Sequence, residues 1–233
     1  MAERCTTVFV TATDTGAGKT AVTALLLGRL LAAGVPARAL KPVASGRPAA
    51  GINEDVAALL QAAGKSPAEA DEINLYSFAM PAAPAIAAAA EGRAIDAGEL
   101  TAWCRRRCRQ ARVCLIEGVG GLMVPLTPSF LVRDWLAAMP EAALLLVVPA
   151  RLGAINHTLL TLAEISRLGR VPRWLVINDG IGGQQAMATQ IAGVLQFHLA
   201  PETTLFTLPR MDDGGMDDPQ VLKFTESWMH DLD

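Results

Sequence analysis

Residues 11–20, Thr-Ala-Thr-Asp-Thr-Gly-Ala-Gly-Lys-Thr, have the composition of a loop that wraps a phosphate group. Small residues such as the Gly-Ala-Gly at 16–18 let consecutive backbone N–H groups point inward at an anion. Lys19 would reach the β- and γ-phosphates of a nucleotide, and the Thr20 hydroxyl would ligate Mg²⁺. The strict pattern has glycine five positions before Gly18, where this chain has Thr13. A turn that only caps a helix is the alternative, but the position between a predicted strand and a predicted helix favours nucleotide binding.

Two acidic residues and a second lysine are candidates to complete such a site. Glu117 ends the apolar run at residues 113–116 and precedes a glycine-rich turn, which predicts a carboxylate at the carboxyl edge of a sheet. Asp55 is the second candidate ligand for Mg²⁺, although its position equally suits a helix N-cap or first-turn acid. Lys41 closes a predicted strand and would suit a developing phosphoryl charge, or would simply be solvated.

His157, in the segment Gly-Ala-Ile-Asn-His at residues 153–157, is interpreted as part of the start of a helix rather than as a catalytic base. Asn156 is the natural N-cap of this helix, and the helix N-terminus is suited to hold a carboxylate.

The composition excludes several classes of protein. The chain has 233 residues, a formal net charge of −3, 52% hydrophobic residues and 18% charged residues. These values predict a sizeable core and argue against disorder and against nucleic-acid binding, which requires a basic excess. We expect no export signal and no membrane segment, and therefore a soluble, cytoplasmic protein with four free thiols. Cys104 and Cys108 share a helix face, but a metal site there is disfavoured by the surrounding arginines.

The elements that must position these residues alternate between short apolar strands and longer helices. Predicted strands lie at residues 6–11, 38–41, 113–117, 143–148, 174–178 and 204–207. Predicted helices lie at residues 20–33, 55–63, 83–91, 97–110, 155–168, 184–197 and 220–230. Continuous apolar strands separated by helices predict an α/β fold of the P-loop NTPase type, a parallel sheet flanked by helices on both faces. We expect one domain over residues 1–233.

Several motifs together resemble the dethiobiotin synthetase family, in order and over most of the chain from about residue 8 to residue 209. The phosphate loop alone is shared by many proteins. The more specific segments are Lys-Pro-Val-Ala-Ser-Gly at 41–46, Glu-Gly-Val-Gly-Gly at 117–121 and Leu-Gly-Ala-Ile-Asn-His at 152–157. The resemblance implies ATP- and Mg²⁺-dependent closure of a ureido ring from diaminopelargonic acid and CO₂, through a carbamate and a carbamic–phosphoric anhydride. It also implies a homodimer, with the tail of the substrate bound at the interface.

Site residues follow from the same resemblance. Catalytic roles fall on Thr15, Lys19 and Lys41, and the metal ligands would be Thr20, Asp55 and Glu117. The substrate would contact Thr15, Lys41, Ser45, Gly153, Ile155 and Asn156. ATP would be held by Gly16, Ala17, Gly18, Lys19, Thr20, Asp55, Glu117, Gly118, Gly120, Asn178, Asp179, Pro209, Arg210 and Met211, with Asn178 reading adenine.

The chain departs from the family pattern at Ala12, where many members have glycine, and at Gly16, where many have glutamate. The segment Pro-Ala-Ala-Pro at 81–84 also lacks the usual hydroxyl residue, which implies weaker hydrogen bonding near the diamine.

Two other functions are less consistent with the sequence. An amide-forming synthetase of the cobyrinic acid type would need a nitrogen source for which the chain has no second domain. A partitioning ATPase would carry a signature lysine four residues before Gly18, where Asp14 stands instead.

Overall fold

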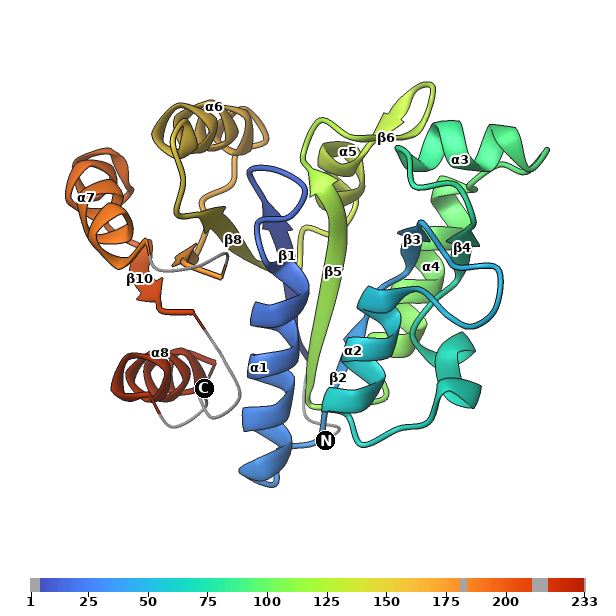
Figure 1. Cartoon of the computed structure of the whole chain (residues 1–233), viewed down its shortest axis with the longest axis horizontal. Coiled ribbons are helices and arrows are strands. Elements are labelled where there is room, and N and C mark those ends of the chain that lie inside the picture. The colour runs from blue at the N-terminus through green and yellow to red at the C-terminus, as the bar shows by residue number, and fades with distance from the viewer. Residues whose placement is uncertain (1–4, 181–183, 211–217, 233) are drawn as a thin grey trace.

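A computed structural model describes residues 5–180, 184–210 and 218–232 of the chain. Its main sheet has six parallel strands in the order β10-β9-β8-β1-β5-β2, which confirms the predicted α/β class (Figure 1). The strands are β1 (Thr6–Ala12), β2 (Ala37–Leu40), β5 (Val113–Gly121), β8 (Ala143–Pro149), β9 (Trp174–Asn178) and β10 (Thr204–Leu208). Almost all residues of β1, β5, β8 and β9 are buried, as expected for strands covered on both faces.

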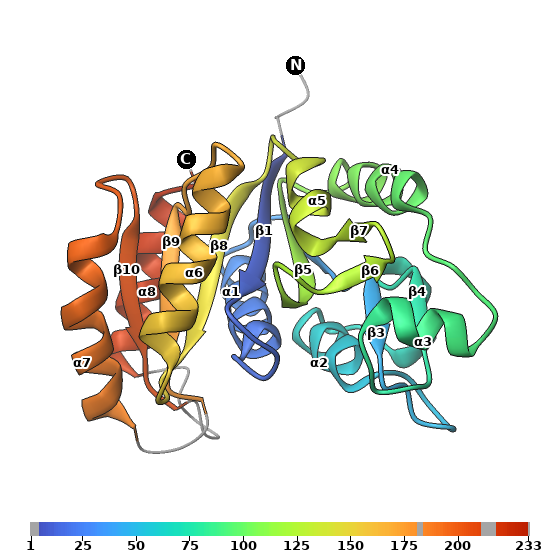
Figure 2. The same ribbon diagram turned by 90° about the horizontal axis from the view of Figure 1, so that it is seen from above.

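Helices cover both faces of this sheet. Figures 1 and 2 show α1 (Lys19–Ala32) and α8 (Pro219–His230) on one face, and α5 (Val132–Ala137) and α6 (Ala154–Arg167) on the other. The remaining helices are α2 (Glu54–Ala62), α3 (Pro84–Ala90), α4 (Ala97–Cys108) and α7 (Gln185–Leu195), with short 3₁₀ helices at Pro67–Glu72 and Gln196–His198. No helix within the described ranges combines the length and apolar character needed to cross a lipid bilayer.

Two small sheets and one short helix, α5, were not predicted from the sequence. Strands β3 (Val43–Ser45) and β4 (Tyr76–Phe78) pair in parallel, and β6 (Pro125–Thr127) and β7 (Phe130–Leu131) form an antiparallel hairpin that leads into α5. All four strands have two or three residues, too short for an apolar period to be visible.

The register of β1 determines where the site lies. Val10 pairs with Glu117 on β5, and Ala12 pairs with Val147 on β8. Because all six strands are parallel, their carboxyl ends meet at one edge, and β1 lies where the strand order reverses. The loop that follows β1 therefore opens at the position where ligands bind in sheets of this kind.

Candidate active site

The loop between β1 and α1 is shaped by glycines with left-handed backbone conformations. Gly18 precedes α1 with φ +91°, and Gly16 has φ +70°. A Cβ at Gly18 would stand 1.9 Å from Asn178 Nδ2, so that only glycine fits there. The first turn of α1 contains no acidic residue, which leaves the positive end of the helix dipole available to an anion.

Lys19, the first residue of α1, is almost fully buried beneath this loop, with 7% of its surface exposed. Its Nζ approaches the backbone oxygen of Asp14 at 3.5 Å. Burial and the nearby positive charge of Lys41 lower the pKa of Lys19 from 10.5 to about 8. A buried, undercompensated ammonium at a helix N-terminus favours the binding of a polyanion.

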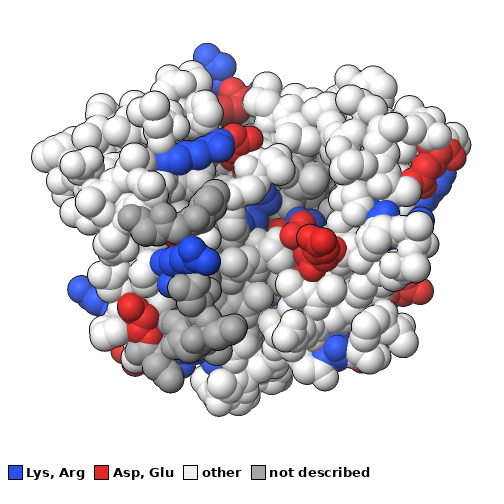
Figure 3. Space-filling view, in the orientation of Figure 1, with Lys and Arg blue, Asp and Glu red and all other residues white. Residues whose placement is uncertain are grey.

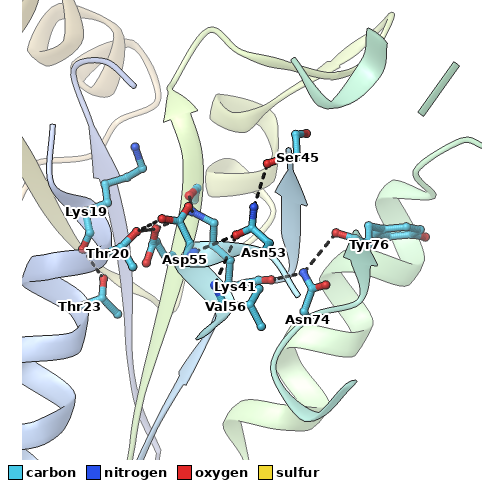
Figure 4. A network of polar contacts seen from close by, with 12 residues as sticks. Lys19, Thr20, Thr23, Lys41, Ser45, Asn53, Asp55, Val56, Asn74 and Tyr76 are labelled. Atoms are coloured by element: carbon cyan, nitrogen blue, oxygen red, sulfur yellow. Dashed lines mark hydrogen bonds and ion pairs between the residues drawn. The ribbon is translucent and has the colours of Figure 1, made fainter. Parts of the chain in front are cut away.

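Three elements bring Thr20, Asp55 and Glu117 together, although they are far apart in the sequence. Figure 4 shows Thr20 of α1 beside Asp55 of α2. Thr20 Oγ1 lies 2.8 Å from Asp55 Oδ1 and 2.7 Å from Glu117 Oε1. Asp55 belongs to the first turn of α2, where Asn53 is the N-cap, and Glu117 is buried on β5. The possibility that Asp55 is itself the cap is therefore wrong.

Lys41 joins the same cluster from the residue after β2, one position beyond the strand end that is observed at Leu40. Its Nζ lies 2.6 Å from Glu117 Oε1 and 2.8 Å from Asp55 Oδ2. Burial alone would lower the pKa of Lys41, but the two carboxylates outweigh it and raise that pKa above its ordinary value. Burial alone would raise the pKa of Asp55, but the positive charge of Lys41 outweighs it and holds that pKa below its usual range. Lys41 is thus a charged lysine buried between two carboxylates.

The donor set of this cluster fits Mg²⁺. Thr20 has one hydroxyl proton and so can donate to only one of the two carboxylate oxygens beside it. Glu117 Oε2 is buried without a hydrogen-bond partner among the described residues. The same part of the chain holds no group of three or more His, Cys, Asp or Glu residues that could bind a metal by themselves. Two carboxylates and one hydroxyl suit Mg²⁺, which completes its shell with water and substrate phosphates.

A cavity of about 700 Å³ opens above the loop, and its size is that of a site for a small molecule or cofactor. Figure 3 shows positive and negative side chains meeting in a hollow near the middle of this face. Its far wall includes Ser45 and the segment at residues 81–84, and Ser45 Oγ is buried without a partner in the described chain. The predicted site residues that line it are Thr15, Gly16, Gly18, Lys19, Thr20, Lys41, Ser45, Asp55, Glu117 and Gly120.

Residues 118–121, which were predicted as a glycine-rich turn after a strand ending at Glu117, instead continue β5, and they support both sides of this cavity. Gly118 O lies 3.4 Å from Lys41 Nζ. Gly120 has φ +57°, and a Cβ there would stand 2.6 Å from Val124 Cγ2 and 3.4 Å from Thr15 Oγ1. A side chain at Gly120 would therefore collide with Val124, and the Thr15 hydroxyl of the phosphate loop lies in contact distance of the same position.

Asn178 lies on the opposite side of the loop from Lys41, at the end of β9. Its Nδ2 donates to the Ala17 carbonyl at 3.1 Å, while its Oδ1 is buried without a partner in the described chain. Asn178 and Asp179 line a second cavity of about 360 Å³ beside the loop. Asp179 is also structural, because its Oδ1 accepts from the Gln184 N–H at 2.9 Å.

The segment that follows β10 reaches the same side. The Asp179 N–H donates to the Leu208 carbonyl at 2.9 Å, which places Pro209 and Arg210 next to this end of β9. Met211 lies outside the described residues.

The structure does not bring Gly153, Ile155 and Asn156 into the cavity that holds Lys41. These residues form the start of α6, which begins at Ala154 with Gly153 (φ +88°) at the N-cap position. The prediction that Asn156 is the N-cap is wrong, because a left-handed glycine turns the chain three residues earlier.

Sequence reasoning missed two residues that organise the site. Arg151, after β8, forms an ion pair with Asp14 of the loop and so connects the loop to the turn before α6. Asn53 donates from Nδ2 to the Ser45 carbonyl at 2.9 Å and accepts from the Asp55 N–H at 3.0 Å. The Asn-Glu-Asp sequence at residues 53–55 was the only available signal, since Asn before an acidic first turn is typical of an N-cap.

The fold and the loop define a nucleotide-binding protein of the P-loop class, and comparisons with known proteins agree. Residues 6–205 match the family model described as an AAA domain. A variant of Cyanothece McdA in complex with ATP has a TM-score of 0.56 at 16% identity, covering 98% of this chain and 96% of that one. A putative plasmid partition protein of Borrelia burgdorferi bound to AMPPNP has a TM-score of 0.54 at 12% identity, covering 97% of each chain. At these identities the likeness concerns the fold alone.

Sequence relatives are more specific. The ATP-dependent dethiobiotin synthetase BioD of Cellvibrio japonicus is 37% identical over 211 residues, covering 90% of this chain and 91% of the relative. The synthetase of the same name from Serratia marcescens is 39% identical over 177 residues, covering 75% and 77%. The chain belongs to the ATP-dependent dethiobiotin synthetase family, which confirms the resemblance noted in the sequence.

Proposed function

We propose that the chain closes the ureido ring of dethiobiotin from diaminopelargonic acid, CO₂ and ATP, as a single domain over residues 1–233. One observation carries the proposal: the cavity of about 700 Å³ joins the phosphate loop to Lys41 and Ser45. An acceptor molecule bound there would lie beside the terminal phosphate of a nucleotide.

In the proposed reaction CO₂ first adds to one amine of the substrate, which loses a proton to give a carbamate. A carbamate oxygen then attacks the γ-phosphorus of ATP, and ADP leaves. The second amine attacks the carbonyl carbon of the resulting anhydride and loses a proton, which the departing phosphate can accept. A C–N bond thereby closes the ring as the C–O bond to inorganic phosphate breaks. No protein nucleophile takes part, and the protein contributes positioning and charge stabilisation.

The residues around the loop divide this work. Thr15 and Lys19 would hold phosphate oxygens, together with the backbone at residues 16–18, and Lys41 would stabilise the charge of the carbamate and the transferring phosphoryl group. Thr20, Asp55 and Glu117 would hold Mg²⁺, which neutralises phosphate charge when it is bound. Ser45, with its unpartnered buried hydroxyl, would contact the diamine.

The adenine would lie on the β9 side of the loop. The unpartnered Asn178 Oδ1 is an acceptor for the adenine amino group, and Asp179, Pro209, Arg210 and Met211 would complete that end. The smaller cavity beside Asn178 supports this assignment.

In the proposed homodimer, the start of α6 in one subunit would bind the carboxylate of the substrate that occupies the cavity of the other subunit. The residues that would bind it are Gly153, Ile155 and Asn156. Two exposed leucines support an interface there, because Leu152 is 93% and Leu160 is 64% exposed. We propose a cytoplasmic location, where ATP is supplied.

The test is an assay with ATP, Mg²⁺ and bicarbonate, with and without diaminopelargonic acid. We expect ADP release that depends on the diamine and a ureido product detected by mass spectrometry. ATP turnover that ignores the diamine, or turnover without a ureido product, would show that the function is different.

A further inference from the structure

Two buried cysteines meet at the end of the sheet opposite the proposed active site. Cys108 is the last residue of α4, and Cys114 is the second residue of β5. Cys114 pairs with Thr7 on β1 and with Arg38 on β2, near the amino ends of these parallel strands. Cys108 is 4% exposed and Cys114 is fully buried. The chemistry proposed above uses neither thiol.

The two sulfur atoms are 2.7 Å apart and share an S–H···S hydrogen bond. This separation exceeds the S–S bond of a disulfide by only about 0.7 Å. The turn between them is tight, since the Ala111 N–H donates to the Cys108 carbonyl at 3.2 Å. Bond formation would thus need a shift of side chains rather than a rearrangement of α4 against β5.

We propose that Cys108 and Cys114 are a thiol–disulfide modification site, oxidised by a low-molecular-weight disulfide such as glutathione disulfide. The Cys108 thiolate attacks one sulfur of glutathione disulfide and releases a glutathione thiolate. Cys114, after losing its proton, then attacks the Cys108 sulfur of the mixed disulfide and releases the second glutathione. Two protein thiols are oxidised to one disulfide while one glutathione disulfide is reduced to two thiols.

Cys108 is the attacking thiol because of its position. It ends a helix and is followed by the exposed residues Arg109 and Gln110, and helix ends open locally more often than their interiors. The hydrogen bond with Cys114 holds the pKa of Cys108 below its ordinary value, whereas burial raises the pKa of Cys114. Cys108 is therefore both the more accessible and the more readily ionised member of the pair.

The other two cysteines do not offer the same geometry. Cys5 Sγ lies 3.9 Å from Thr7 Oγ1, and Cys104 is buried one turn before Cys108 on α4. Within the described residues the single sulfur–sulfur hydrogen bond joins Cys108 and Cys114. A metal does not explain the cluster, because the described chain holds no group of three or more ligands able to bind one.

The experiment treats the folded full-length chain with glutathione disulfide, quenches it with acid and measures intact mass and free thiols. We expect a loss of about 2 Da, the mass of two hydrogen atoms, and a fall in titratable thiols from four to two, both reversed by dithiothreitol. Peptide mapping without reduction should recover one cross-link, between the peptides containing Cys108 and Cys114.

Matched variants make the outcome decisive. Cys5→Ser should still lose about 2 Da, whereas Cys108→Ser and Cys114→Ser should not, while all three retain the circular dichroism spectrum of the parent chain. Stable glutathione adducts on Cys108 without the cross-link, a cross-link to Cys5 or Cys104, or four thiols remaining after exposure would each overturn the proposal.

Discussion

Lys41 touches the same two carboxylates that would hold a metal, with Nζ 2.6 Å from Glu117 and 2.8 Å from Asp55. An ammonium group and Mg²⁺ cannot both occupy that position. We therefore expect Lys41 to turn toward the transferring phosphoryl group when the metal binds. In this view one lysine neutralises the carboxylates in the free enzyme and the reacting oxygens during turnover.

Replacing Lys41 by methionine tests the competition directly. Because a positive charge beside both ligands disappears, we expect Mn²⁺ to bind about tenfold more tightly in the absence of nucleotide. Electron paramagnetic resonance of free Mn²⁺ gives the affinity. Lys65→Met is the matched control, since Lys65 pairs with Glu69 and Glu72 on the surface and should leave Mn²⁺ binding unchanged. Unchanged or weaker binding in the Lys41 variant would exclude the exchange.

The catalytic role proposed for Lys41 predicts a different signature for Lys41→Ala. A group that acts mainly in the transition state contributes to turnover more than to ground-state binding. We expect ATP affinity within about threefold of the parent chain and a fall in turnover of at least about a hundredfold. Calorimetry measures the ATP affinity, and the diamine-dependent ADP assay described above measures turnover. Equal losses in both would mean that Lys41 only binds ground-state phosphate.

Glu117→Gln tests the proposed metal site by changing one of its two carboxylates. The amide keeps the shape of the side chain but removes the charge, so we expect the Mg²⁺ concentration that gives half-maximal activity to rise about tenfold or more. Glu69→Gln, at an exposed ion pair, is the control. An unchanged Mg²⁺ titration would remove Glu117 from the metal site.

Lys19 predicts a pH dependence of nucleotide binding. Its pKa of about 8 in the free protein means that the ammonium loses its proton just above neutral pH, whereas bound phosphates favour the charged form. ATP binding should therefore take up a proton near pH 8, and the affinity should fall by up to about tenfold per pH unit above it. Calorimetry in buffers of different ionisation enthalpy measures the uptake. Lys19→Met should bind weakly and show no such uptake, and the same pH profile in both chains would refute the assignment.

At the scale of elements, the loop after β1 and the end of β9 are packed so closely that Gly18 and Asn178 form one unit. Gly18→Ala would place a methyl group 1.9 Å from Asn178 Nδ2, whereas Gly16→Ala, also at positive φ, meets nothing within 4 Å. We expect Gly16→Ala to cost about 1–2 kcal/mol of backbone strain in the free energy of unfolding. Gly18→Ala should lower the free energy of unfolding by more than this, as measured by urea denaturation. Adding Asn178→Ala to the Gly18→Ala chain should recover part of the difference. Equal costs for the two glycine variants would contradict this packing.

The elements differ in how far they could be predicted from the sequence. Long apolar strands such as residues 143–148 and the Gly-Lys-Thr loop carry strong local patterns, and both were predicted correctly. Strands β3 and β4 are fixed by each other and by contacts such as that of Asn53 with Ser45, which no local pattern reveals. Asp55 likewise looked like an ordinary first-turn acid, because its partners Thr20 and Lys41 come from distant elements. Burial of charged groups is a property of the assembled fold.

At the scale of the whole molecule, we propose that the complete site is formed by two copies of the chain, a proposal consistent with the start of α6 lying outside the cavity that holds Lys41. Mixing Lys41→Ala with Asn156→Ala chains should then restore activity that neither variant has alone. After random exchange of subunits, about half of the dimers are heterodimers, and each heterodimer has one intact site of two. The recovered activity should therefore approach about a quarter of the parent activity. Light scattering after exchange confirms the dimer. Absence of recovery in a proven heterodimer would place Asn156 in the same site as Lys41 of its own chain.

The position of β1 between β8 and β5 has a consequence for how such a protein can diversify. The proposed contacts to the nucleobase come from the β8–β9 side, through Asn178 and Asp179, whereas Ser45 and the segment at residues 81–84 come from the β5–β2 side. The phosphate loop contacts both sides: Ala17 accepts a hydrogen bond from Asn178, and Thr15 and Lys19 line the cavity that holds Ser45. A substitution on the side of Ser45 therefore leaves the nucleobase side unchanged. The residues that contact the acceptor can change while those that bind the nucleotide stay the same.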